Sequence, residues 1–146
     1  MGRVSRNSLS PEALLDLQDH FTYLISTLSK KSDIDHFLQQ FLTDEEKIML
    51  SKRLMLYMMI KQKYHEDAIQ AVLRMSHESI RTYRLALKLQ SAFFHEMLEK
   101  LIKRETSKVF WKKVERFLEG LDIVMTAKTN MRSRAKLATG QAFHDD

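Results

Sequence analysis

The stretch from Glu66 to Arg84 combines polar and charged side chains with a distinctive apolar spacing. Its second half is rich in short polar, hydrogen-bonding and cationic side chains: Ser76, His77, Glu78, Ser79, Arg81, Thr82 and Arg84. On the outer face of a helix, groups of these kinds can reach the base edges and phosphates of duplex DNA. We therefore take them as candidate DNA-binding residues, together with Gln70 from the first half of the stretch.

The apolar residues of the same stretch have the spacing of a helix-turn-helix. They lie at offsets of 0, 4, 6, 11 and 14 from the first: Ile69, Leu73, Met75, Ile80 and Tyr83. The offset of six is out of helical phase, which predicts a tight turn between Leu73 and Ser76. Ser76 is placed to cap the second helix. Arg74 stands at the turn position where glycine is usual, and a left-handed conformation there costs about 1 kcal/mol.

Basic residues are concentrated in the second half of the chain. Residues 73–146 carry 15 basic and 9 acidic side chains, whereas residues 1–72 carry 9 and 10. Such an excess of cations favours a polyanionic partner, most often nucleic acid. The candidates for contacts with phosphates are Lys61, Lys63, Arg74, Lys128, Arg132, Arg134 and Lys136.

These residues are expected to lie on helices. The sequence has 3 glycines and 1 proline, too few for the turns of a many-stranded sheet. A first helix is predicted from Ser10 to about Ser29, because a capping serine precedes a proline and apolar residues then recur at spacings of three and four. A second, short helix is predicted after a cap at Ser32 or Asp33.

The clearest helix start is the capping box Thr43-Asp44-Glu45-Glu46. In this motif the first and last side chains each accept a hydrogen bond from the other residue's backbone N–H. The helix that follows is apolar at every position from Leu54 to Ile60, which predicts burial on several sides. It is expected to end at Lys61 to Lys63.

The second helix of the helix-turn-helix is predicted to continue from Ser76 without a break to about Arg104. A last helix, capped by Thr106 or Ser107, carries an apolar stripe formed by Phe110, Val114, Phe117 and Leu121. After it, residues 127–146 are predicted to form a basic, flexible tail.

Three segments together resemble the Trp repressor superfamily: Phe41–Glu46, Leu50–Arg53 and Tyr64–Leu87. The resemblance covers residues 34–90 and extends to uncharacterised relatives on the same scaffold. It implies an all-helical, intertwined homodimer in which the N-terminal helices wrap around the partner. It also implies that the two helix-turn-helix units enter successive major grooves of DNA.

The tryptophan pocket of that family is only partly matched. Thr43 and Arg53 stand where the family has pocket residues. Thr82, however, replaces the arginine that stacks on the indole, and Tyr83 replaces a neighbouring glycine. Because the Tyr83 ring would fill the space that a ligand needs, we expect no tryptophan corepressor.

We expect an all-α fold, an intertwined helical bundle with a helix-turn-helix and a C-terminal helical extension. Residues 1–104 would form a Trp repressor-like domain, with dimerisation helices in 10–62 and the helix-turn-helix in 66–87. Residues 105–126 would form a C-terminal helix that packs on this domain, ahead of the tail.

The predicted function is a sequence-specific, double-stranded DNA-binding transcriptional regulator that acts as a homodimer. An α-helical protein-interaction adaptor and a general nucleic-acid-binding protein without sequence readout are the alternatives. Arg81 and Arg84 favour DNA, because an adaptor has no need of these cations. Trp111, which has cations beside it, could stack on bases, although its place in a helical pattern favours packing instead.

Other functions have little support in the residue types. The sequence has no cysteine, which removes thiolate chemistry, disulfides and sulfur-based zinc sites. His95 and Glu99 have metal-ligand spacing, but a third ligand is not evident, so we expect no metal and no cofactor. No glycine-rich phosphate loop is present, and we expect no enzyme. With no secretory signal and no long apolar run, we expect a cytoplasmic protein with no membrane partner.

Overall fold

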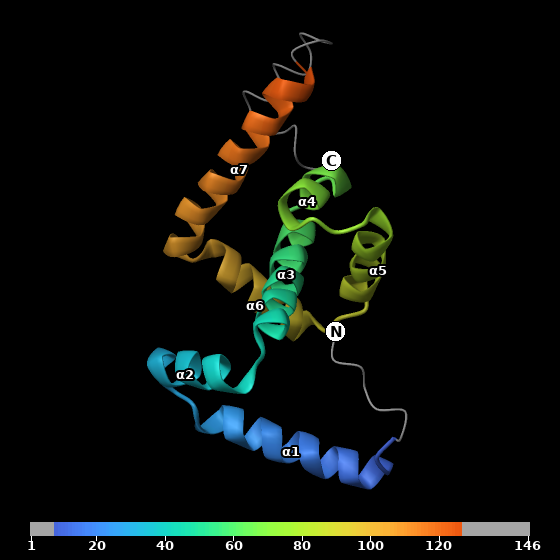
Figure 1. The fold of residues 1–146 in the computed structure, drawn as a ribbon, viewed down its shortest axis with the longest axis vertical. Coiled ribbons are helices and arrows are strands. Elements are labelled where there is room, and N and C mark those ends of the chain that lie inside the picture. Colours follow the sequence, from blue (N-terminus) through green and yellow to red (C-terminus); the bar gives the residue numbers. More distant parts are fainter. Residues whose placement is uncertain (1–7, 127–146) are drawn as a thin grey trace. The chain divides into compact units, whose positions relative to one another are not determined.

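The structure, a computed structural model, describes residues 8–126, and in this part it confirms the all-α prediction (Figure 1). It forms seven helices and no strand there. They are α1 (Pro11–Thr27), α2 (Lys31–Phe41), α3 (Asp44–Lys61), α4 (Glu66–Leu73), α5 (His77–Lys88), α6 (Ala92–Lys103) and α7 (Glu105–Thr126). None of these helices combines the length and the apolar character that a membrane crossing requires. The predicted tail, residues 127–146, lies outside the described residues.

Side-chain caps begin α1 and α3 as predicted. The Ser10 hydroxyl accepts a hydrogen bond from the Ala13 N–H at 3.2 Å. The capping box is complete, because Thr43 Oγ1 accepts from the Glu46 N–H at 3.2 Å and Glu46 Oε2 accepts from the Thr43 N–H at 2.9 Å. The Thr43 hydroxyl also donates to Glu46 Oε2 at 3.0 Å. The two hydrogen bonds that the Glu46 carboxylate accepts, the one from the backbone foremost, lower the pKa of this carboxyl below its usual value.

The start of α2 differs from the prediction. The helix begins at Lys31, and its N-cap residue Lys30 makes no side-chain capping bond. Ser32 and Asp33 lie inside the first turn, so neither caps the helix. The Asp33 carboxylate in that turn still interacts favourably with the positive end of the helix dipole, so it is compatible with a helix that starts at Lys31.

The prediction of one helix from Ser76 to Arg104 is wrong. The chain turns after Lys88, and α6 starts afresh with the Ser91 hydroxyl accepting a hydrogen bond from the Phe94 N–H at 3.4 Å. This break allows α6 to fold back and bury Leu98, which is 1% exposed.

The start of α7 also differs from the prediction, because the helix begins at Glu105, before either predicted cap. Ser107 lies inside the helix and donates its hydroxyl to the Leu101 carbonyl at 2.7 Å. The hydroxyl therefore ties α7 to the last turns of α6 instead of capping a helix.

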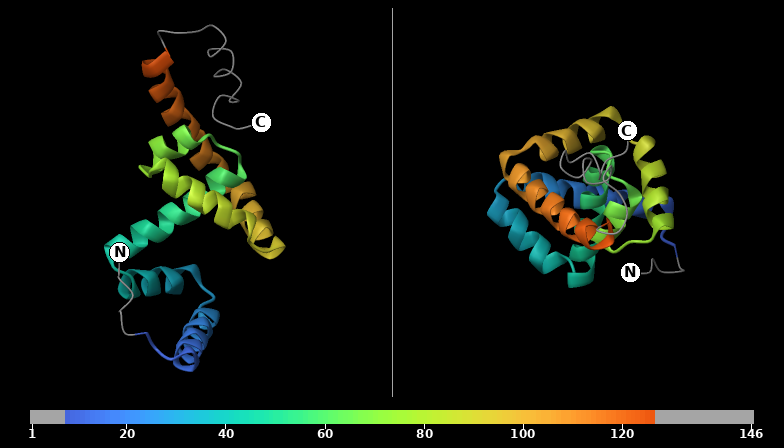
Figure 2. Two further views of the ribbon diagram at one scale, coloured as in Figure 1. Left: turned by 90° about the vertical axis from the view of Figure 1, so that its right-hand side faces the viewer. Right: turned by 90° about the horizontal axis from the view of Figure 1, so that it is seen from above.

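The chain divides into two units, Met1–Ser51 and Lys52–Asp146, and the boundary lies inside α3. In the second unit α4 packs against α5 and α7, and α6 packs against α7 (Figure 2). One hydrophobic core joins all five helices of this unit and the loop before α4. It consists of Leu56, Met58, Met59, Tyr64, Ala68, Ile69, Leu73, Ile80, Leu87, Leu98, Trp111, Val114 and Leu118. The helix-turn-helix is therefore held by helices that precede and follow it.

The apolar run of α3 is buried in its second part. Leu56 and Met59 are fully buried and Met58 is 7% exposed, which confirms burial on more than one side. Leu54, at the start of the run, is 42% exposed and does not share this burial.

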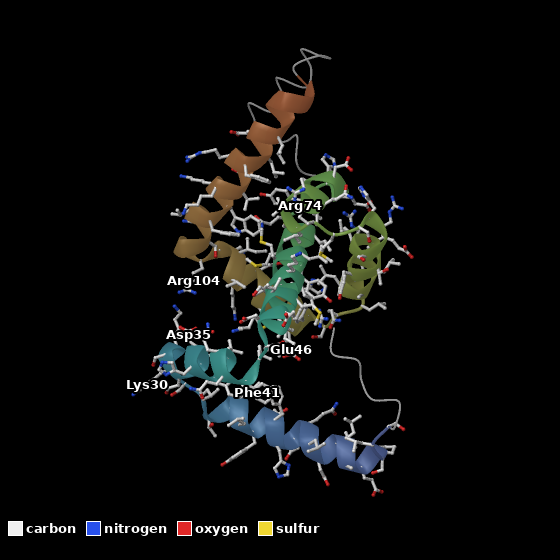
Figure 3. The ribbon with its side chains drawn as sticks, viewed as in Figure 1. Lys30, Asp35, Phe41, Glu46, Arg74 and Arg104 are labelled. Atoms are coloured by element: carbon white, nitrogen blue, oxygen red, sulfur yellow. The ribbon has the colours of Figure 1, made fainter. Side chains whose placement is uncertain are left out.

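In the first unit, α1 and α2 meet through aromatic rings. The ring centroids of Phe21 and Phe41 lie 5.5 Å apart, and those of Phe37 and Phe41 lie 5.0 Å apart. Figure 3 labels Phe41 at the end of α2, beside α1. Even so, neither helix contains a buried residue. Their apolar side chains are open to solvent: Leu14, Leu17, Phe21, Leu24, Ile25, Ile34, Leu38 and Phe41.

Candidate nucleic-acid interface

The turn between α4 and α5 has the predicted conformation. Arg74 caps the end of α4 in the left-handed region, with φ 54° and ψ 48°, and its N–H donates to the Gln70 carbonyl at 2.9 Å. Two residues later the Ser76 hydroxyl accepts from the Ser79 N–H at 3.2 Å and so caps α5. Figure 3 labels Arg74 where α4 gives way to this turn.

The apolar pattern of the helix-turn-helix is confirmed by burial. Ile69 and Ile80 are fully buried, one from each helix, and Leu73 is 5% exposed. Met75 in the turn and Tyr83 on α5 are half-buried and pack against the same core. The two helices are thus fixed against each other by the five residues that the spacing selected.

Replacement of Arg74 by glycine should stabilise the protein. Glycine has no Cβ and adopts φ 54° without the strain that Arg74 bears, although it gains freedom in the unfolded chain. We expect Arg74→Gly to raise the free energy of unfolding by about 0.5–1 kcal/mol, measured by urea denaturation. Arg74→Ala removes the same charge but keeps a Cβ. A gain of the same size in Arg74→Ala would contradict the role of the backbone conformation.

The outer face of the corner, from Gln70 near the end of α4 through the turn to α5, is open to solvent. Six of the candidate residues are exposed there: Gln70, Arg74, Ser76, Glu78, Arg81 and Thr82. His77 and Ser79 are half-buried. Donors and acceptors therefore lie together at the start of α5, the end that approaches the bases when such a helix enters a major groove.

Arg84 does not lie on this outer face as predicted. It is half-buried, and its Nε atom has lost contact with solvent. The reason is helical geometry: Arg84 follows Ile80 by four residues and precedes Leu87 by three, so it shares the inward face of α5.

Glu66, the first residue of α4, connects the two helices and was missed by the sequence analysis. Its Oε2 atom accepts from Arg81 Nε at 3.1 Å and lies 3.3 Å from His77 Nδ1. The next residue, Asp67, places Oδ1 3.3 Å from His77 Nε2. Two acids at the start of α4 thus hold two candidate residues at the start of α5.

The Glu66 carboxylate is stabilised as an anion by its neighbours. Burial alone would raise its pKa, but the hydrogen bond from His77 and the charges of Arg81 and Arg84 outweigh burial and lower the pKa below the usual value. At neutral pH Glu66 is therefore an anion surrounded by cationic and hydrogen-bonding groups.

Tyr83 lies on the inner face of α5. Its ring was expected to fill the space that a tryptophan ligand would need. Its ring meets Tyr57 at a centroid distance of 5.9 Å, and the guanidinium of Arg53 lies 5.7 Å from its centre.

Family models, curated proteins and solved structures give no match to this chain. The likeness to the Trp repressor superfamily stays a prediction from its motifs.

Of the cations considered for phosphate contacts, Lys61 is turned towards α6. Its Nζ lies 3.0 Å from Glu99 Oε1 and 3.3 Å from His95 Nδ1, and its side chain is 26% exposed. The hydrogen bond from Lys61 and the positive charge of its ammonium group lower the pKa of the Glu99 carboxyl. Lys63 is exposed and has a left-handed backbone, with φ 61°. The remaining four candidates, Lys128, Arg132, Arg134 and Lys136, lie outside the described residues.

Trp111 packs in the core, as its place in a helical pattern favoured, and does not present its ring for stacking on bases. The residue is 6% exposed and its ring stacks on that of Tyr64 at a centroid distance of 5.8 Å. Burial of Tyr64 in the same place raises the pKa of its hydroxyl. The predicted stripe of α7 is also displaced: Trp111, Val114 and Leu118 are buried, whereas Phe110, Phe117 and Leu121 are 40–47% exposed.

Among the side chains that the structure describes, no three metal-ligating groups come together. The pair singled out by its spacing, His95 and Glu99, has the ammonium group of Lys61 as its neighbour.

Proposed function

We propose that this chain is a sequence-specific, double-stranded DNA-binding transcriptional regulator that acts as a homodimer and places α5 in the major groove. The observation that carries the proposal is the corner formed by α4, the left-handed Arg74 and the Ser76 cap. This corner sets the start of α5 at the surface with its polar side chains outward. A helix with side chains is about 10–12 Å across, which suits a major groove about 12 Å wide.

Charge supports a polyanionic partner. The whole chain has a formal net charge of +5, and the excess lies in the half that contains α5. Arg74 and Arg81 are exposed on the corner itself, where they can meet phosphates or bases.

The first unit supports the homodimer. The helices α1 and α2 bury none of their residues, yet they carry a continuous set of apolar side chains that are 37–56% exposed. An interface of standard size takes about 800 Å² from each partner, and a face of several large apolar side chains is the kind of surface that such an interface covers. A second copy would cover this face symmetrically and would bring two helix-turn-helix units to one duplex.

Fluorescence anisotropy with a labelled duplex tests the proposal. A duplex of random sequence should bind, and log affinity should fall linearly with log salt, by about 0.9 for each phosphate contact. On a duplex selected by the protein from a random library, Arg81→Ala should cost about 1–3 kcal/mol and relax the sequence preference.

Lys100→Ala is the matched control, because it removes one exposed cation from α6 rather than from the corner. A wild-type chain that binds no duplex at low salt would contradict the proposal and would favour the protein-interaction adaptor. Equal losses in Arg81→Ala and Lys100→Ala would mean that α5 does not read the bases.

A further inference from the structure

We infer that Glu66 is a positioning residue that holds the Arg81 guanidinium ready for a base contact, a role that rests on the proposed DNA binding. Glu66 is the first residue of α4, whereas Arg81 lies on α5. The contact therefore spans the corner and exists only when the two helices are packed as described.

The geometry leaves the two terminal nitrogens of the Arg81 guanidinium available to donate to a base. Its Nε donates to both carboxylate oxygens of Glu66, at 3.1 Å to Oε2 and 3.4 Å to Oε1. No other hydrogen bond of Arg81 is formed among residues 8–126, and its side chain is 68% exposed. The guanidinium is planar, so binding through Nε orients its plane and leaves the two terminal nitrogens to donate. That pair of donors matches O6 and N7 of guanine.

Glu66 itself is recessed and restrained. Its side chain is 23% exposed, compared with 68% for Arg81, so the cation lies in front of the carboxylate on the solvent side. His77 contacts the same carboxylate oxygen, and Asp67 contacts the other nitrogen of that histidine. A guanidinium restrained in this way loses less rotamer freedom on binding, which strengthens the contact that it makes.

A positioning role and simple charge repulsion predict opposite results for the loss of Glu66. An acid near DNA repels every phosphate, so its removal should strengthen binding to all duplexes. If Glu66 positions Arg81, its removal should weaken only the duplex that Arg81 reads, while binding to a scrambled duplex stays equal or becomes tighter.

The experiment uses the full chain, a duplex selected from a random library by the wild-type protein, and a scrambled duplex of the same composition. Anisotropy gives the ratio of the two affinities. We expect Glu66→Gln to lower this ratio by about five- to tenfold, since a good bidentate contact discriminates by about tenfold or more. Glu66→Asp keeps the charge but shortens the reach, and it should lower the ratio as well. Glu96→Gln, an exposed acid of α6, is the matched control and should leave the ratio unchanged.

A double-mutant cycle separates the inference from the proposed function. In an Arg81→Ala background, Glu66→Gln should have no further effect on the ratio. An unchanged ratio in Glu66→Gln, an equal loss on both duplexes, or a full effect in the absence of Arg81 would each overturn the positioning role while leaving DNA binding in place. If the wild-type chain selects no duplex at all, the proposed function fails, and the role of Glu66 fails with it.

Discussion

Ile69→Ala should lower the free energy of unfolding by about 2–5 kcal/mol. Ile69 is fully buried in α4, in the core that joins the helix-turn-helix to α3 and α7. Truncation removes buried methyl groups and leaves a cavity between helices that cannot close freely around it. The loss is large because a domain of this size is stable by only about 5–15 kcal/mol.

Trp111 provides the probe for this measurement. It is the single tryptophan of the sequence and is 6% exposed in the same core, so its fluorescence reports on this unit in urea denaturation. Leu85→Ala is the control, because Leu85 lies on α5 but is 63% exposed and should cost less than about 0.5 kcal/mol. If both variants lost equally little stability, Ile69 would not lie in a closed core.

Leu17→Asp should convert the proposed homodimer into a monomer and weaken binding to a selected duplex by at least about a hundredfold. Leu17 belongs to the apolar stripe of α1 and is 56% exposed in the single chain. In a dimer that covers this stripe, an unpaired carboxylate would have to leave water, which costs several kcal/mol. A monomer also retains only one half-site contact, and the second helix-turn-helix no longer binds as part of the same complex.

Light scattering at micromolar concentration, followed by anisotropy, measures both effects. Leu15→Asp is the matched control: it makes the same substitution in the same helix, at a leucine that is 65% exposed and lies off the stripe. We expect this variant to remain a dimer. A wild-type chain that is monomeric, or a Leu17→Asp variant that remains dimeric, would rule out this face as the interface.

The parts of the fold that sequence alone predicts are those set by neighbours in the chain. The capping box needs only Thr43 and Glu46, and the structure contains both of its hydrogen bonds. The turn at Arg74 follows from an apolar spacing that breaks helical phase within a few residues. Both patterns are set by residues close together in the sequence, so tertiary packing does little to change the cap or the turn.

The break after Lys88 depends on tertiary structure instead. The segment Leu89-Gln90-Ser91 contains neither glycine nor proline, and helical spacing can be followed across it. What decides the break is burial of Leu98 in a core that several helices build. Ser91 was the one available signal, because serine is a favoured N-cap.

The role of Glu66 and the choice of the buried face of α7 were also beyond a local pattern. Glu66 and Arg81 are 15 residues apart, and they meet only because α4 and α5 cross. Packing of Trp111 was the favoured prediction and is confirmed. Two apolar stripes of α7 share Val114, one with Phe110 and the other with Trp111, and which of them is buried depends on where α4 lies. An acid at the start of one helix and an arginine on the next are too common to predict a contact.

The stacking of Tyr64 on Trp111 has a consequence for how the protein folds during its synthesis. Tyr64 lies just before the helix-turn-helix, and Trp111 lies on α7, well after it. A growing chain that has left the ribosome only as far as α6 contains every residue of the corner but lacks Trp111, Val114 and Leu118. Its core is still open on one side, so the corner becomes stable late, when most of α7 has emerged.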